Sequence, residues 1–133
     1  MSINIQRNQK KRVVIVGGGL GGLRLAEDLY GSGMQVVLID KNNFHQFPPL
    51  IYQIASAGID PSSISFPFRQ IFRKQKDFYF RMAEARMVDV EKKILQTSIG
   101  KIDYDYLVLA AGATTNFFGN KNIEEWAMPM KNV

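Results

Sequence analysis

The sequence predicts an α/β fold in which a parallel βαβ sheet is joined by an antiparallel β-meander. Three features carry this prediction: a continuous apolar run at 12–16, a helical apolar pattern at 20–30 and a second apolar run at 34–39. Continuous apolar runs are typical of strands that are buried on both faces of a parallel sheet. A strand, a helix and a strand in this order indicate one right-handed βαβ unit.

The composition is that of an ordinary globular domain. The 133 residues are 46% hydrophobic and 22% charged, which is enough for one core or for part of a larger one. Cysteine is absent, so these residues supply no disulfide, thiolate metal ligand or dithiol redox pair. The opening residues lack the apolar region of a signal peptide, and no run is long enough to span a bilayer. We therefore expect a cytoplasmic protein.

The formal charge of +5 comes partly from two basic clusters, at 10–12 and at 69–76. Neither cluster has interleaved stacking aromatics within a recognised nucleic-acid-binding module. We interpret both clusters as solvated surface and expect no nucleic-acid partner.

The first helix is expected to begin at Leu20 and to stop at Gly31 and Gly33, because glycine readily adopts the left-handed conformation that ends helices. The second strand ends at Asp40. Residues 44–56 are rich in aromatics and contain prolines, and we expect an apolar loop there that needs a surface to cover.

The later elements are shorter. Residues 68–72 are expected to form a short helix after Pro67, and 78–80 a third strand. The apolar run at 106–110 predicts a last buried strand that leads into Ala111 and Gly112.

Between these strands the pattern alternates and turns. Strands are expected at 86–91 and 94–97, with turns near 92–93 and at Gly100 and Lys101. This spacing predicts an antiparallel hairpin or meander, and not another crossover helix.

A glycine signature, G-x-G-x-x-G, connects the first strand to the helix at Gly17, Gly19 and Gly22. Gly17 permits a tight turn, Gly19 lets the backbone approach a pyrophosphate, and Gly22 lets the helix pack closely on the sheet. Asp40 ends the second strand, where a carboxylate can accept hydrogen bonds from a ribose diol. Because strand, glycines, helix, strand and acid occur in the required order, a Rossmann-like dinucleotide site is favoured over a purely structural turn.

Two later features favour FAD over NAD as the dinucleotide. The meander resembles the insertion of glutathione-reductase-like flavoproteins, and residues 105–112 resemble their second signature, an apolar strand that ends in Ala-Thr-Gly. This sequence has Ala111 in place of the usual threonine and keeps Gly112.

Residues 43–56 separate the subfamilies of this fold. Disulfide reductases carry a redox-active cysteine pair in this region, and this chain has none. The stretch resembles the N-x-H-x-F-x-P-L-L-Y-Q-V-A-T motif of type II NADH:quinone oxidoreductases (NADH dehydrogenases), and residues 109–119 resemble them as well. The chain departs from that motif at Pro48, Ile51, Ile54 and Ser56.

The resemblance implies an enzyme that takes hydride from NADH onto FAD and passes two electrons to a membrane quinone in a respiratory chain, without pumping protons. The flavin carries the chemistry in such enzymes, so we expect no catalytic side chain and no metal ligand here. The implied cofactor-binding residues are Gly17, Gly19, Leu20, Gly21 and Gly22 at the pyrophosphate, Asp40 and Lys41 at the adenosine ribose, Ala85 at the adenine through its backbone, and Ser56, Ala111 and Gly112 on the flavin side. His45, Phe47 and Tyr52 are interpreted as packing residues of the loop.

The resemblance also predicts the domain organisation. Residues 1–10 are expected to be a polar N-terminal tail, 11–120 the N-terminal part of an FAD-binding domain, and 121–133 the start of a linker to an NADH-binding domain outside these residues. NADH, quinone and peripheral membrane contacts on the cytoplasmic face would come from regions not present. We expect the 133 residues alone to bind FAD weakly or not at all, to be inactive and to be prone to self-association.

Two other interpretations stay open at this point. One is another flavoprotein of the same fold, of the sulfide:quinone or ferredoxin reductase type. The other is a non-catalytic nucleotide-binding module.

Overall fold

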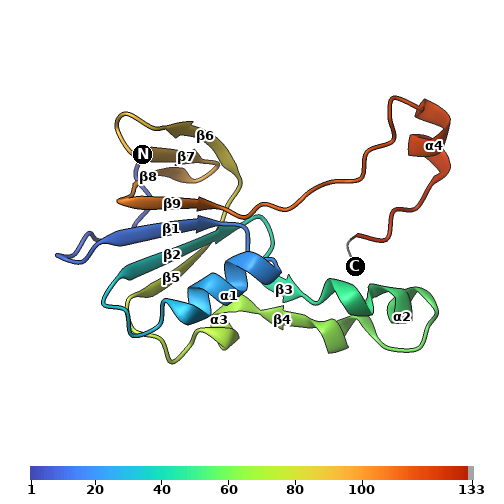
Figure 1. The fold of residues 1–133 in the computed structure, drawn as a ribbon, viewed down its shortest axis with the longest axis horizontal. Helices are drawn as coiled ribbons and strands as arrows, with labels where there is room; N and C mark the ends of the chain where they lie inside the picture. The colour runs from blue at the N-terminus through green and yellow to red at the C-terminus, as the bar shows by residue number, and fades with distance from the viewer. Residues whose placement is uncertain (132–133) are drawn as a thin grey trace.

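The computed structural model describes residues 1–131 and has a four-stranded parallel sheet at its centre (Figure 1). Its strands are β1 (Arg12–Val16), β2 (Gln35–Asp40), β5 (Phe78–Met82) and β9 (Tyr106–Leu109), in the order β5-β2-β1-β9. All three pairings are parallel. The two apolar runs predicted as central strands are buried almost throughout, which confirms the predicted α/β class.

Helices α1 (Leu20–Asp28) and α3 (Phe68–Ile71) lie on one face of this sheet (Figure 1). Because successive side chains of a strand point to opposite faces, alternate residues of β1 and β2 face the helices. Val13, Ile15 and Leu38 pack there in one cluster with Ala26 and the aromatic side chains that follow β4. The predicted first helix is confirmed, and the structure shows that it covers one face of the sheet.

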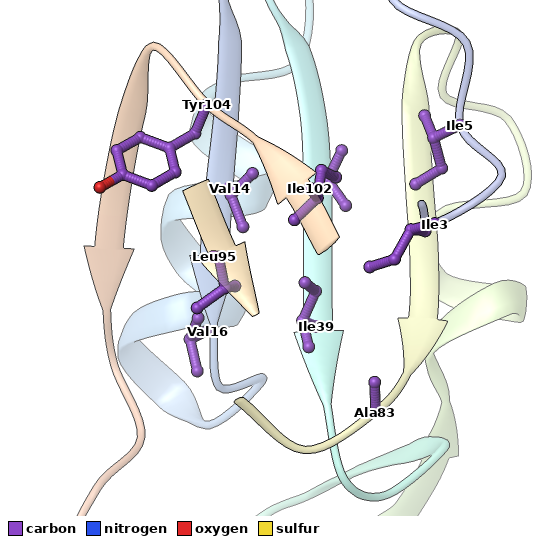
Figure 2. Close-up of a cluster of buried hydrophobic side chains, with 10 residues drawn as sticks. Ile3, Ile5, Val14, Val16, Ile39, Ala83, Leu95, Ile102 and Tyr104 are labelled. Atoms are coloured by element: carbon purple, nitrogen blue, oxygen red, sulfur yellow. The ribbon is translucent and has the colours of Figure 1, made fainter. Parts of the chain in front are cut away.

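The meander covers the opposite face (Figure 2). Its strands are β6 (Ala85–Asp89), β7 (Ile94–Thr97) and β8 (Gly100–Asp103), all antiparallel. Leu95 and Ile102 project from it onto Val14, Val16 and Ile39 of the parallel sheet. The result is three layers: helices, parallel sheet and meander.

One predicted turn is wrong by two residues. Gly100 and Lys101 open β8, and the turn is formed by the preceding pair, 98–99. Thr97 pairs with Gly100 across this two-residue turn, and the Thr97 hydroxyl donates to the Gly100 carbonyl at 2.7 Å. Gly100 has a φ of +137°, a left-handed conformation that favours glycine, so the glycine marks the end of the turn.

The opening residues, predicted as a polar tail, contribute to the core. Ile3 and Ile5 are 4% and 8% exposed and pack with the meander cluster (Figure 2). The Ile3 amide donates to the Lys101 carbonyl at 2.9 Å, next to a bridge between Ser2 and Lys101. Two apolar side chains among polar neighbours are a weak sequence signal for burial. Their burial is favourable only because the meander provides a surface for them.

An ion-pair network joins the amino end of β1 to the carboxyl end of β8. Arg12 is 2% exposed, and its guanidinium donates to Asp103 Oδ1 at 2.7 Å and to Gln35 Oε1 at 2.5 Å. Burial lowers the pKa of Arg12, although Asp103 opposes this effect. Asp105 accepts the backbone amide of Arg12 at 2.7 Å, and this hydrogen bond lowers the pKa of the Asp105 carboxyl.

An arm of short elements replaces the loop that was predicted at 44–56. It extends away from the sheet (Figure 1). Strands β3 and β4 pair antiparallel within it, and the two prolines at 48–49 begin a 3₁₀ helix, where a missing amide is tolerated. The elements of the arm are β3 (Phe44–Gln46), η1 (Pro48–Leu50), α2 (Ile51–Ala55), η2 (Pro61–Ile64) and β4 (Ser65–Pro67).

The C-terminal segment contains α4 (Lys121–Trp126), which stands apart from the sheet (Figure 1). The Asn120 side chain caps it by accepting the Ile123 amide at 3.2 Å. Trp126 and Met128 are 79% and 93% exposed. The predicted linker falls here, and its last two residues, 132–133, lie outside the described residues. Among the helices of residues 1–131, none is long and apolar enough to cross a membrane.

Candidate nucleotide-binding site

The carboxyl ends of the parallel strands meet at one edge of the sheet, and most of the predicted site residues lie there. The Gly17 amide donates to the Ile39 carbonyl at 2.8 Å, and the Ala110 amide donates to the Val16 carbonyl at 2.7 Å. These bonds hold the glycine turn between the ends of β2 and β9. Ligands of open α/β sheets bind at this edge.

Close backbone contacts require glycine at positions 17 and 22. A Cβ at Gly17 would lie 2.3 Å from the Ala110 carbonyl oxygen, and Gly17 also has a φ of +102°. A Cβ at Gly22 would lie 1.8 Å from the Gly17 carbonyl oxygen. Both contacts are with backbone atoms, which cannot turn aside as a flexible side chain would.

Gly19 and Gly21 are glycines for a different reason. A Cβ at either position would meet no atom within 4 Å, and both residues are exposed. The space above them is open, which fits the close approach of a ligand to the backbone.

The amides at the start of α1 are free to bind an anion. Gly19 is the N-cap and makes no side-chain cap. The amides of Gly19, Leu20 and Gly21 donate no hydrogen bond to any atom of residues 1–131. The positive end of the helix dipole adds to these donors, so the turn has the donor set that a phosphate requires.

Asp40 lies beside this turn, and its carboxylate is already engaged. Oδ2 accepts the Gly18 amide at 2.6 Å, and Oδ1 accepts the Asn42 amide at 2.8 Å. Each carboxylate oxygen has a second lone pair, so Asp40 retains the capacity to accept from a ribose hydroxyl. The structure thus gives Asp40 a role that its place in the sequence did not predict, which is to hold the turn.

The structure brings some of the remaining predicted residues to this edge and not others. Lys41 is exposed directly after β2. Ala111 and Gly112 are exposed after β9, and Ala111 lies next to Gly17. Ala85 begins β6 shortly after the end of β5, where the Ala83 amide donates to the Asp40 carbonyl at 2.8 Å.

Ser56 is not brought to this edge. It caps α2 on the arm, beyond β3 and β4, and its hydroxyl donates to the Gln53 carbonyl at 3.1 Å (Figure 1).

Sequence reasoning did not assign three residues to the site: Gly18, within the turn, and His45 and Phe68, which contact it. His45 Nδ1 lies 2.9 Å from the Gly18 carbonyl oxygen, and the Phe68 ring packs against Gly18. The one available signal was the additional glycine Gly18, at a motif position that accepts any residue.

A hollow with a volume of about 380 Å³ lies at the opposite edge of the sheet. It is lined by residues at the amino ends of β2 and β5, including Met34, Val36 and Phe78. None of the predicted site residues lines it, so it is separate from the glycine turn.

Comparison with known proteins shows the family of the chain. A family model described as pyridine nucleotide-disulphide oxidoreductase matches residues 11–130. Over 132 residues the chain is 33% identical to type II NADH:quinone oxidoreductase Ndh of Mycobacterium tuberculosis, covering 96% of this chain and 28% of that protein.

Two solved structures share the fold. NDH2 from Plasmodium falciparum in complex with NADH superposes with a TM-score of 0.82 at 26% identity, over 90% of this chain and 26% of that one. The sulfide:quinone oxidoreductase of Aquifex aeolicus gives a TM-score of 0.74 at 31% identity, over 80% of this chain and 25% of that one. The chain therefore spans about a quarter of the length of each relative.

Proposed function

The chain belongs to the pyridine nucleotide-disulphide oxidoreductase family, and from this membership we propose that it forms the FAD-binding part of a type II NADH:quinone oxidoreductase. The observation that carries the proposal is the set of free amides at Gly19, Leu20 and Gly21, beside Asp40 and at the carboxyl edge of the sheet. This arrangement suits the ADP half of a dinucleotide.

Each residue of the edge has a distinct task in this proposal. The free amides would bind the pyrophosphate, and Asp40 would accept from the ribose through its remaining lone pairs. Lys41 and the Ala85 backbone are assigned to the adenosine end, and Ala111 and Gly112 to the flavin side. Ser56 is assigned to the flavin side by resemblance alone, because its position on the arm does not support the role.

When bound, the flavin would supply hydride acceptance and electron transfer, and the protein would supply position and electrostatics. The proposed reductant is NADH and the proposed acceptor a quinone, because the relatives carry these names. The NDH2 match covers 90% of this chain and the sulfide:quinone match 80%, which favours the NADH enzyme. We place the whole enzyme peripherally on the cytoplasmic face of the membrane, since its proposed acceptor is dissolved in the bilayer.

A competition titration tests the nucleotide-binding part of this proposal. FAD binding to the chain is followed by flavin fluorescence, and ADP and FMN are then added separately. ADP carries the groups assigned to the glycine turn and Asp40, so it should displace FAD, and FMN should bind more weakly than FAD. Equal affinity for FMN and FAD, or no competition by ADP, would contradict the assignment of the ADP half to this edge.

A further inference from the structure

Gly18 is held on both sides of its Cα by side chains from other elements. Its amide donates to Asp40 Oδ2 at 2.6 Å, and its carbonyl oxygen lies 2.9 Å from His45 Nδ1. A carbonyl oxygen only accepts, so Nδ1 must carry the hydrogen and donate. Both peptide groups that flank Gly18 are therefore fixed, one by β2 and one by β3.

The His45 contact is buried and geometrically constrained. His45 is 5% exposed and Phe68 is fully buried. The two rings are tilted at 58° with centroids 6.5 Å apart, and Phe68 packs in turn on Phe80 of β5, with centroids 5.0 Å apart. His45 thus has one orientation, set by aromatic packing between the arm and the sheet.

Phe68 also explains why residue 18 is glycine. A Cβ at Gly18 would lie 2.2 Å from Phe68 Cζ, although the G-x-G-x-x-G motif itself accepts any residue at this position. The glycine lets the turn sit directly on the Phe68 ring, which brings its carbonyl within reach of His45.

The amides next along the chain are the ones left free for an anion. Gly19, Leu20 and Gly21 follow Gly18 directly, so the orientation of their N–H groups depends on the two peptide groups that His45 and Asp40 hold. Donors that are already oriented bind more tightly, because the ligand does not have to order them.

We propose that His45 is the positioning residue of the glycine turn, holding the Gly18 carbonyl opposite the Asp40 carboxylate so that the Gly19–Gly21 amides face the phosphate. The geometric part of the inference rests on the contacts of Gly18 with His45 and Asp40. Its consequence for binding rests on the proposed FAD site. The commitment of Nδ1 to the Gly18 carbonyl gives His45 a role in orienting the turn.

The test compares His45→Asn with His45→Gln, and adds His45→Leu. Asn carries its amide nitrogen at the same bond distance from Cβ as Nδ1, whereas Gln carries it one bond further. The two variants are matched in polarity, so only Asn should restore the donor to Gly18. Backbone order parameters of ¹⁵N-labelled chain are measured at Gly18, Gly19 and Gly21, with Val37 in β2 as the reference.

Wild type and His45→Asn should show rigid values, about 0.85, at the three glycines, while His45→Gln and His45→Leu should fall toward about 0.6 there with Val37 unchanged. FAD affinity should drop about tenfold or more in His45→Gln and His45→Leu and stay within about threefold of wild type in His45→Asn. Equal order parameters in Asn and Gln variants would overturn the proposal, even if the leucine variant does not fold. If the wild-type chain binds FAD too weakly to titrate, the order parameters by themselves decide the role of His45.

Discussion

Gly19→Asp should separate the folding role of the glycine turn from its binding role. The backbone of Gly19 has φ −70° and ψ −167°, an extended conformation open to any residue, and a Cβ there meets no atom within 4 Å. Gly19 is the N-cap of α1, where aspartate is a preferred residue. The new carboxylate can accept from the same first-turn amides that are proposed to bind the pyrophosphate.

The two expected effects have opposite signs. Replacing an N-cap glycine by aspartate gains a few tenths of a kcal/mol, and the helix dipole adds about 0.3–1 kcal/mol. The unfolding free energy of the ligand-free chain should therefore stay level or rise. FAD should lose charge-assisted hydrogen bonds worth about 1.5–3 kcal/mol each, so its affinity should fall by roughly ten- to a hundredfold.

Urea unfolding without ligand and FAD titration measure the two effects separately. Gly19→Asn is the matched control, because asparagine caps as well as aspartate does but brings no charge. It should weaken FAD binding less than Gly19→Asp. Unchanged FAD affinity in Gly19→Asp, in a chain of normal stability, would refute the placement of the pyrophosphate at this turn.

Three further perturbations follow from particular contacts. In the full-length enzyme, Asp40→Ala should lower FAD affinity by about 1.5–3 kcal/mol, since it removes the proposed ribose acceptor and frees the Gly18 amide; unchanged flavin retention after dialysis would count against that role. Gly22→Ala should lower the unfolding free energy by about 1–3 kcal/mol or more, because its Cβ would meet the Gly17 carbonyl oxygen at 1.8 Å, whereas Gly21→Ala should change it little; equal urea midpoints would contradict the contact. Asp105→Asn should lower the melting temperature at pH 7 and match wild type in acid. Its carboxyl has a lowered pKa in the fold, so its contribution is present above the unfolded pKa of about 3.9 and lost as pH falls through the folded pKa. A deficit that is constant with pH would refute this.

Local patterns predicted much of the fold because their causes are local. The apolar runs at 12–16 and 34–39 became buried parallel strands, and the glycines at 17–22 became a strand-to-helix turn. The prediction was weakest at 44–56, where aromatics and prolines suggested a loop. The pairing of β3 with β4, a partner about 20 residues away in sequence, is a nonlocal contact that no periodicity within the stretch reveals.

The candidate site also has residues that could be predicted from the sequence and residues that could not. Gly17, Gly19, Gly22 and Asp40 could be named from sequence, because strand order and turn geometry are sufficient to bring them to one edge. Ser56 was named by resemblance, and the structure leaves it on the arm.

The sequence by itself determined that a βαβ unit with a dinucleotide-type turn would form, because hydrophobic periodicity and glycine conformation act over a few residues. Only the tertiary structure decided what surrounds that turn. The contact between His45 and Gly18, the Phe68 ring that excludes a side chain at Gly18, and the burial of Ile3 and Ile5 beneath the meander all join segments far apart in the chain. Their energies come from burial and from donors paired across those segments, which exist only once the layers have packed.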